Sequence, residues 1–347
     1  MSGELIRALP AQEQTSPRTA RRPAPSVFLG RLGEAYLPSL REGLGFVGLG
    51  NHLRPGDTVF VKPNLTYPVY RPGVMTSPAC IEDLVVALKD YGARVIVGES
   101  DGGGYNRFPM HQVFAATGLG AMAARHGIEL VNLSQCPSRA IRFDYRGRVF
   151  SLPLPVLLLD RVDVFITVPV PKVHANTRLS LSIKNQWGCI QEPALRLRLH
   201  PYFAAVIHQV NRALKVRFSV VDGRWGLNRN GPMRGDAVPL GWLLVSDDLT
   251  AADVTCARLM GVQPRAVPHL RDPFSQAPLP PPESLRMSQD PGAFAGPRFY
   301  LQREFWDLPG LLAFRHPGLA YLAYRSPLAR ILHRGLYLFR EKFYEHD

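Results

Sequence analysis

Cysteine is scarce in this chain of 347 residues, and its four copies lie far apart, at Cys80, Cys136, Cys189 and Cys256. No pair has the C-x-x-C spacing of a zinc ribbon or a ferredoxin-type cluster, so an iron–sulfur cofactor is not expected. The same spread does not fit the disulfide framework of a small secreted domain. A reducing compartment is favoured, and the cytoplasm is the expected location.

Long hydrophobic runs are absent as well. No segment reaches the roughly 18 apolar residues that a membrane-spanning helix needs. No apolar run follows the "PRTARRPAP" stretch near the N-terminus, so an export signal is not expected. Helix-turn-helix, zinc-finger and aromatic RNA-binding signatures are also missing, which argues against nucleic acid as a partner.

Lysine is rare although the chain is strongly basic. The net charge is +13, and 35 of the 41 basic residues are arginine, which leaves six lysines. This charge favours a small anionic ligand or an anionic membrane surface as a partner, although an arginine-rich composition alone can also produce it. A buried lysine, unlike arginine, can lose its proton and expose a nucleophilic amine. The places where lysine is kept are therefore informative.

Composition divides the chain into four segments. Residues 1–27, rich in proline, arginine and serine, are expected to form a disordered arm, and residues 28–271 an α/β domain. A proline-rich linker is expected over 272–297, and a basic helical tail over 298–347.

Within 28–271, short β-branched runs alternate with helical patterns, which predicts an α/β fold with a mostly parallel sheet flanked by helices. Strands are predicted at 57–62, 93–100, 128–133, 163–170, 217–223 and 241–248. Helices are predicted at 77–92, 111–127 and 249–261, and a hairpin with Arg146-Gly147 at its turn.

The tail carries arginine but no acid. Five arginines and no aspartate or glutamate lie between Leu311 and Arg340, and apolar residues from Leu328 onward fall on one helical face. Residues 311–343 are therefore expected to form a basic amphipathic helix that can lie on an anionic membrane surface. Packing against the α/β domain, or against a second subunit in a homo-oligomer, is the alternative.

Polar side chains follow most of the predicted strands. The carboxyl ends of parallel strands meet at one edge of a sheet, where α/β proteins bind ligands. Residues suited to anion binding at this edge are Lys62, Asn64, Arg178 and Asn185. Residues suited to catalysis are Lys172, His174, Lys184 and His200, the last if the segment before it folds back over the strand ends.

The acids allow more than one interpretation. A divalent metal site is possible with the ligands His174, His200, Asp222 and Asp247. The same two histidines suit a general acid and base, because imidazole titrates near neutrality. Asp222 before a glycine also suits a turn, and Asp247 or Asp248 before a helix suits an N-cap. The sequence leaves these alternatives open.

Four motifs together resemble the domain of unknown function 362 family over about residues 57–262. They are K-x-H at Lys172, S-x-K-N-x-x-G at Ser182, D-G followed by G-P-x-x-G from Asp222, and D-D-x-x-A-x-D from Asp247. Many members of that family look like iron–sulfur proteins with an added ferredoxin segment. This chain lacks the cysteine spacing of that segment, so the iron–sulfur role is not carried over.

The arrangement is more distantly similar to nickel-pincer lactate racemase. That similarity implies a lysine that holds a pincer cofactor, a histidine on nickel and histidines for proton transfer. The matching positions here are Lys184 or Lys172 for the cofactor, with His174 and His200 for the metal and the protons.

Two hypotheses follow. The first is an enzyme that acts on a small carboxylated substrate by proton transfer or metal-assisted chemistry, as an isomerase or epimerase does. The second is a non-catalytic module that binds an anion or a metallo-cofactor, peripheral to a membrane.

Overall fold

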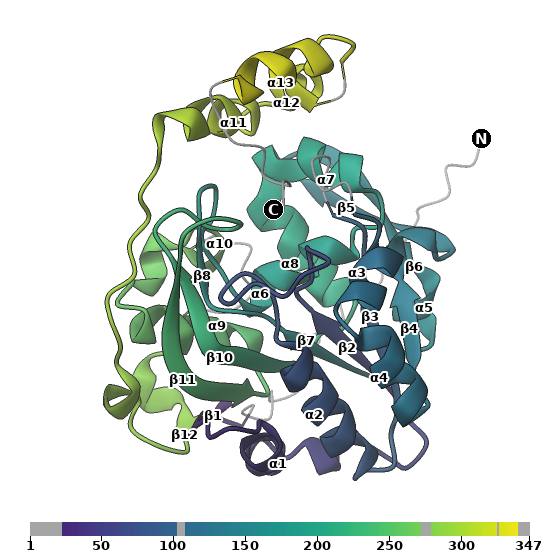
Figure 1. The fold of residues 1–347 in the computed structure, drawn as a ribbon, viewed down its shortest axis with the longest axis vertical. Coiled ribbons are helices and arrows are strands. Elements are labelled where there is room, and N and C mark those ends of the chain that lie inside the picture. The colour runs from purple at the N-terminus through teal and green to yellow at the C-terminus, as the bar shows by residue number, and fades with distance from the viewer. Residues whose placement is uncertain (1–22, 103–107, 272–278, 325, 339–347) are drawn as a thin grey trace, which may run out of the picture.

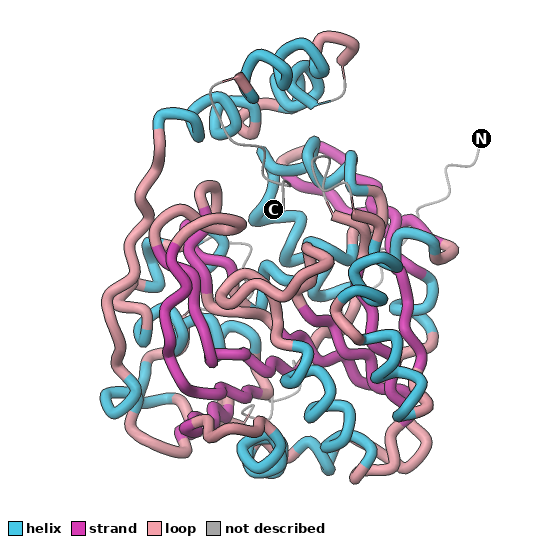
Figure 2. Tube along the Cα trace, viewed as in Figure 1, coloured by secondary structure: helices cyan, strands magenta, loops and turns pink. Residues whose placement is uncertain are grey.

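A computed structural model of the chain describes residues 23–102, 108–271, 279–324 and 326–338. One large mixed sheet crosses the centre of the molecule, with helices on both faces (Figures 1 and 2). Its strands run in the order β12 (Arg286–Met287), β1 (Ser26–Arg31), β11 (Asp236–Ser246), β10 (Phe218–Asn228), β7 (Val164–Val168), β2 (Thr58–Pro63), β3 (Arg94–Glu99) and β4 (Glu129–Asn132). The short strands β8 (Lys172–His174) and β9 (Arg178–Ser180) extend it beside β10.

The sheet is mostly parallel, as the sequence predicts. Strands β10, β7, β2, β3 and β4 all run the same way. Strands β11 and β9 are the exceptions, since β11 lies antiparallel to both β10 and β1, and β9 lies antiparallel to β8. Every residue of β2 and β7 is buried, because both faces of the sheet are covered.

The helices form two layers, each with its own hydrophobic core. One core contains residues of α1 (Leu37–Phe46), α2 (Pro78–Lys89), α3 (Met110–Ala116) and α4 (Leu119–His126). The other contains residues of α5 (Val156–Asp160), α6 (Ser182–Asn185), α7 (Pro193–Leu199), α8 (Phe203–Ala213), α9 (Leu249–Leu259) and α10 (Pro268–Arg271). The expected hairpin is present as β5 (Ser138–Tyr145) and β6 (Arg148–Pro155), and Gly147 has a positive φ at its turn. The helix predicted over 111–127 is divided between α3 and α4, because Gly118 takes a left-handed conformation between them.

Two of the expected segment boundaries are wrong. Strand β1 begins at Ser26, inside the segment 1–27 that was expected to be an arm, of which residues 1–22 lie outside the described residues. The expected linker 272–297 packs against the body over its described part, 279–297. Strand β12 pairs with β1, and Phe294 is buried beneath the Arg31 guanidinium. Apolar residues spaced among the prolines explain this packing, since burying them offsets the loss of chain freedom.

The C-terminal helices form an outer layer. After β12 the chain runs along one side of the molecule (Figure 2) to α11 (Leu308–Ala313), α12 (Pro317–Tyr324) and α13 (Ala329–Tyr337), which stand apart from the sheet (Figure 1). Helix α12 contacts α7. The last part of the expected amphipathic helix, 339–343, lies outside the described residues. No helix in the described parts of the chain is both long and apolar enough to cross a bilayer.

Candidate active site

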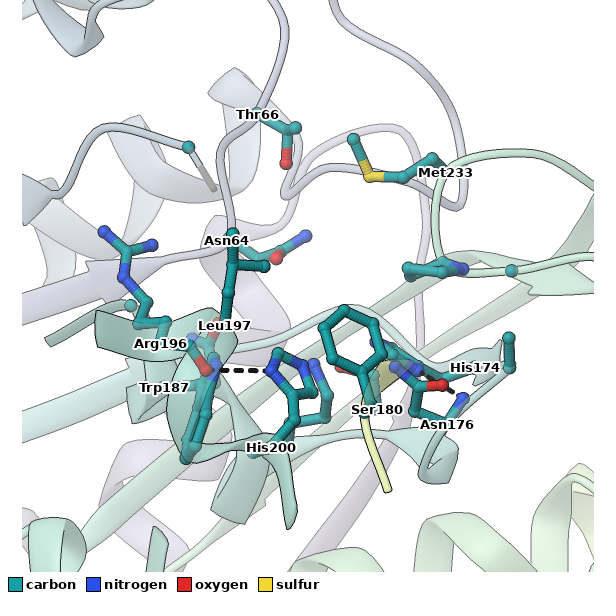
Figure 3. A pocket seen from close by; sticks show the side chains of 18 of the residues that line it. Asn64, Thr66, His174, Asn176, Ser180, Trp187, Arg196, Leu197, His200 and Met233 are labelled. Atoms are coloured by element: carbon teal, nitrogen blue, oxygen red, sulfur yellow. Dashed lines mark hydrogen bonds between the residues drawn. The ribbon is translucent and has the colours of Figure 1, made fainter. Parts of the chain in front are cut away.

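A cavity of about 380 Å³ lies at the carboxyl ends of β2 and β3, where α/β sheets bind ligands. Its walls come from these strand ends, from residues 174–188 and 196–200, and from the loop 230–233. Gly310 and Leu311 of α11, with Phe314, cover part of it. In Figure 3 His174, His200 and Arg196 lie on one side of the cavity, and Thr66 and Met233 on the opposite side.

Lys62 forms a buried ion pair at the base of the cavity. Its Nζ lies 2.5 Å from Glu99 Oε2 and also donates to the Pro63 carbonyl at 2.9 Å. The other Glu99 oxygen accepts the backbone N–H of Ser100 at 2.9 Å. A buried pair with its remaining positions hydrogen-bonded is a stable arrangement, whereas either partner alone would be costly to bury. The charges of Lys62 and Glu99 therefore compensate each other.

Gly188, the last residue of the S-x-K-N-x-x-G motif, makes room for this pair. A Cβ at this position would lie 2.7 Å from Glu99 Oε1 and 3.1 Å from Lys62 Nζ. Such contacts are shorter than van der Waals distances allow, and both side chains are held by hydrogen bonds. The motif thus needs glycine for a steric reason.

Lys184 lines the same cavity without a carboxylate partner. Among the described residues its Nζ has neither a hydrogen-bond acceptor nor an acid within salt-bridge distance, and it lies 5.9 Å from the ring centre of Phe203. Burial, and then the charge of Lys62, lower the pKa of Lys184 to about 8.

Lys172 lies just outside the cavity lining. Its Nζ donates to the Val74 carbonyl at 2.9 Å. Burial, followed by the charge of Lys184, lowers the pKa of Lys172 to about 7. Both lysines of this segment are therefore poised to gain or lose a proton near neutral pH.

Arg196 adds a buried guanidinium to the wall. It donates to Ser100 Oγ at 3.0 Å, to the Asp101 carbonyl at 2.7 Å and to the Ile190 carbonyl at 2.9 Å. All three acceptors are uncharged. Two carboxylates line the cavity, and Glu99 is paired with Lys62, while Asp307 accepts the backbone N–H of Glu304 at 3.0 Å. Lys184 and Arg196 thus leave a net attraction for an anion.

The two histidines of the cavity present opposite hydrogen-bonding groups. Nδ1 of His200 lies 2.8 Å from the Arg196 carbonyl, which can only accept, so Nδ1 carries the hydrogen and Nε2 has a free lone pair. Nδ1 of His174 accepts the backbone N–H of Asn176 at 3.1 Å, so the neutral ring carries its hydrogen on Nε2. The hydrogen bonds therefore assign one proton acceptor and one proton donor.

Both histidines are neutral at pH 7. Burial, and then the charge of Lys184, lower the pKa of His200 to about 4. The same two causes hold the pKa of His174 well below its ordinary value. Neutral imidazole is the form that can accept a proton on one nitrogen while donating from the other.

Aromatic rings enclose His200. The Phe314 ring, directly after α11, stacks on it with ring centres 4.0 Å apart, and the Trp187 ring meets it edge-on at 5.3 Å. The buried indole N–H of Trp187 has no hydrogen-bond partner within the described part of the chain. A ligand acceptor in the cavity would satisfy this donor.

The two asparagines expected to bind a substrate hold the walls of the cavity together. Asn185 Nδ2 donates to the Lys62 carbonyl at 3.0 Å and to Thr167 Oγ1 at 2.9 Å. Asn64 Nδ2 donates to the Val74 carbonyl at 2.6 Å. Both residues line the cavity, so their amide groups set its shape.

The expected metal ligands do not come together. Because β11 runs antiparallel, Asp247 follows it at the opposite edge of the sheet, where it accepts the Ser26 N–H at 2.8 Å. Asp222 accepts from Tyr36 Oη and from the Ser77 N–H, both at 2.8 Å, among the residues of the α1–α2 layer. Neither aspartate lines the cavity with His174 and His200. Over all the described residues, no three His, Cys, Asp or Glu side chains are grouped to hold a metal ion.

Arg178 also lies outside the cavity lining. It is exposed at the turn between β8 and β9, with a φ of 65°. The structure thus does not bring Arg178, suggested by the sequence for anion binding, into the cavity wall, because it opens β9 opposite His174 with its side chain exposed.

Asp248 and Asp253 of the D-D-x-x-A-x-D motif have structural roles. Asp248 accepts the Ala251 N–H at 2.8 Å and is the N-cap of α9, one of the alternatives that the sequence left open. Asp253 accepts the backbone N–H groups of Ser182 and Ile183 at 2.7 and 3.1 Å. It therefore fixes the start of α6, which carries Lys184 and Asn185.

Four residues of the site were not foreseen as site residues: Glu99, Trp187, Arg196 and Phe314. Glu99 had a signal, since it ends a strand beside the one that ends in Lys62. Trp187 lies inside the S-x-K-N-x-x-G motif. Arg196 is one of 35 arginines, and Phe314 comes from the distant tail, so nothing local distinguishes either.

Comparisons with known proteins agree with the resemblance in the motifs. Residues 59–258 match the family described as "Domain of unknown function (DUF362)". The "Thylakoid-associated protein sll1697" of Synechocystis sp. (strain ATCC 27184 / PCC 6803 / Kazusa) is 27% identical over 248 residues, which cover 67% of this chain and 72% of the relative.

Two solved structures align with part of the chain. The lactate racemase apoprotein from Thermoanaerobacterium thermosaccharolyticum aligns with a TM-score of 0.43 and 12% identity over 70% of this chain. A structural-genomics target from Thermotoga maritima aligns with a TM-score of 0.35 and 12% identity over 60% of this chain. The alignments span 58% and 54% of those two proteins, less than two thirds of each. Since the family match spans more than half of this chain, the protein belongs to the DUF362 family.

Proposed function

We propose that the protein is an enzyme that binds a small carboxylated substrate in this cavity and moves a proton on it, as an isomerase or epimerase does. The observation that carries the proposal is the pairing of two neutral histidines of opposite tautomer beside cations that no carboxylate of the described residues neutralises. The cations and the histidines are both needed, because the substrate must be bound as an anion and also held within reach of a base and an acid.

The cations supply the binding. A carboxylate between Lys184 and Arg196 would give each its missing counter-charge, and the free Trp187 N–H would add a hydrogen bond. Enclosure by α11 strengthens these interactions, because charges attract more strongly where water is excluded.

The histidines supply the chemistry. His200 Nε2 takes a proton from the carbon next to the substrate carboxylate, and the electron pair left on that carbon is stabilised by the neighbouring cations. His174 Nε2–H donates a hydrogen bond to the carboxylate oxygen on which the negative charge gathers. The imidazolium of His200 then returns its proton to the neighbouring carbon, which gives an isomer and leaves both rings neutral again.

Hydrogen exchange tests this proposal directly. Small carboxylic acids that carry a C–H next to the carboxyl group are incubated with the protein in D2O, and deuterium incorporation is followed by NMR. We expect exchange with at least one such acid, lost in His200→Gln and kept in His111→Gln, whose ring is exposed on α3. Exchange that persists in His200→Gln contradicts the assignment of the base.

The alternative is a module that binds an anion or a metallo-cofactor without turnover. Within the described residues the side chains form no three-ligand metal site, so a metal here would need ligands from a cofactor. Lys184, His174 and His200 are the residues that would hold such a group. Elemental analysis and intact mass of protein from its natural host, compared with Lys184→Ala/His174→Ala, distinguish this case, because a cofactor gives added mass or metal that the variant loses.

A further inference from the structure

The C-terminal helices expose an unusual amount of apolar surface. Eight large apolar side chains of α11–α13 and the turn before α13 are between 43% and 65% exposed: Leu308, Leu312, Leu319, Tyr321, Leu322, Leu328, Ile331 and Leu332. From residue 23 to residue 304, the described chain exposes large hydrophobic side chains to this degree only at Val69, Val149 and Tyr300. The apolar surface is therefore concentrated in the layer that stands apart from the sheet in Figure 1.

The charge of this layer has one sign. Residues 311–340 contain five arginines and no acidic residue, and Arg315 and Arg334 are exposed. A second copy of the same surface would bring like charges together, which disfavours self-association through it. Leucine and isoleucine beside arginine suit the boundary of an anionic bilayer, where phosphate groups accept the guanidinium and acyl chains accept the apolar side chains.

The same layer covers part of the cavity. Gly310, Leu311 and Phe314 line it, and the Phe314 ring covers His200 with ring centres 4.0 Å apart. Leu312 of the same short helix faces outward and is 54% exposed. Helix α11 therefore presents one side to the catalytic histidine and the other to the apolar surface.

We propose that α11–α13 dock on an anionic lipid surface, and that docking draws α11 away from His200 and opens the cavity. Inserting Leu312 and its neighbours into the bilayer boundary gains apolar burial that the free protein lacks. This gain competes with the stacking of the Phe314 ring on His200 and with the contacts between α12 and α7. The inference does not depend on what the cavity binds.

Vesicle binding tests the docking. The full chain is mixed with vesicles of phosphatidylcholine alone or with 30% phosphatidylglycerol, and bound protein is measured by co-sedimentation. We expect binding to the anionic vesicles, reduced roughly tenfold in Ile331→Asp and about fivefold in Arg334→Glu. The matched controls are Val149→Asp, which is 70% exposed on β6, and Arg161→Glu, exposed after α5, and both should bind as the native protein does.

Chemical modification of His200 tests the opening. Diethylpyrocarbonate acts on neutral imidazole, and the modified histidine is identified by mass spectrometry. We expect His200 to react several times faster with anionic vesicles present, whereas the exposed His111 reacts at one rate throughout. Phe314→Ala should make His200 react fast with or without vesicles, which shows that the ring is the barrier.

Three results would overturn the proposal. Absence of binding to anionic vesicles excludes the lipid partner and leaves an acidic protein surface as the class to examine. Equal losses in the Val149→Asp or Arg161→Glu controls exclude α11–α13 as the docking surface. Vesicle binding that leaves the rate of His200 modification unchanged excludes the coupling between docking and opening of the cavity. None of these results bears on deuterium exchange, so the function proposed for the cavity fails or stands separately.

Discussion

Lys184 carries a charge that no described acid of the protein neutralises, and its pKa of about 8 makes that charge depend on pH. A lysine is charged below its pKa, and a bound carboxylate raises that pKa by stabilising the ammonium. The complex then holds more protons than the free protein, so affinity for an anion must fall as the pH rises through the pKa. The lower pKa of Lys172, about 7, extends the same trend toward neutrality.

Calorimetry with malonate checks this dependence. We expect the affinity for malonate to fall several-fold between pH 7 and pH 9. Near pH 8 binding should be accompanied by proton uptake, which is measured by comparing the heat of binding in buffers with different ionisation enthalpies. Lys184→Gln should bind weakly and lose most of the uptake, and Lys215→Gln, an exposed lysine, should change neither. Affinity that rises with pH would contradict the role of Lys184.

Gly188 leaves the space that the Lys62–Glu99 ion pair occupies. In Gly188→Ala the new methyl group displaces Glu99 from Lys62, so we expect a loss of about 1–3 kcal/mol in the free energy of unfolding. Urea denaturation measures it. The control is Gly45→Ala on the exposed side of α1, where an added Cβ has open space and should stabilise the helix by up to about 1 kcal/mol. Equal effects at the two glycines would argue against the steric explanation.

Lys172 and Lys184 could be singled out because lysine is rare and both fall in motifs, whereas Arg196 could not. A buried arginine looks like any other in a chain with 35 of them. What distinguishes Arg196 is the set of carbonyl and hydroxyl acceptors around it, and these come from separate strands and turns. Such a set forms only when the chain is folded.

At the scale of elements, the position of Lys184 depends on an acid in another helix. Asp253 in α9 accepts the two N–H groups that begin α6. We expect Asp253→Ala to cost about 1–3 kcal/mol, because it leaves two buried donors without partners, and to weaken malonate binding as well. Asp248→Ala removes only the N-cap of α9 and should cost about 1 kcal/mol with malonate binding intact. Thermal unfolding measures the loss of stability of each variant, and calorimetry measures its malonate binding. Unchanged malonate binding in Asp253→Ala would show that α6 keeps its position without Asp253.

The same acid gives a pH dependence of stability. Burial raises the pKa of Asp253 to about 7, so the native state holds its proton where the unfolded chain has released it. Stability contributed by this group is present below about pH 4 and is lost as the pH rises to about 7. Asp253→Asn does not titrate, and we therefore expect the native protein to lose stability relative to this variant between pH 4 and pH 7 in urea denaturation. A constant difference over that range would contradict the raised pKa.

Strand positions were predictable from hydrophobic runs, but strand direction was not. The apolar pattern of β11 is the same whichever way the strand runs, and reading it as parallel placed Asp247 at the wrong edge. The spacing gave no signal either, because the predicted strands left residues 224–240 between them, enough for a parallel crossover. In the structure both strands are longer, and only the seven residues Arg229 to Gly235 join them, which suits an antiparallel pair.

At the scale of the whole molecule, the C-terminal region has two parts with different roles. Phe294 and Phe299 are buried in the core, whereas α11–α13 bury few residues. We expect a chain ending at Glu304 to melt within a few degrees of the native protein. A chain ending at Arg271 should melt much lower, because it loses β12 and both rings. Calorimetry of the two truncated chains measures both melting temperatures. Equal values would mean that residues 272–304 add nothing to the stability of the core.

The rarity of lysine has a consequence for how the molecule responds to its surroundings. Outer cations are largely arginine and keep their charge up to about pH 12, while two lysines in and beside the cavity discharge between about pH 7 and pH 8. A mildly alkaline shift therefore reduces the positive charge of the interior and leaves the exterior potential almost constant. An anionic ligand in the cavity would then be released while a partner held by the outer arginines stays bound.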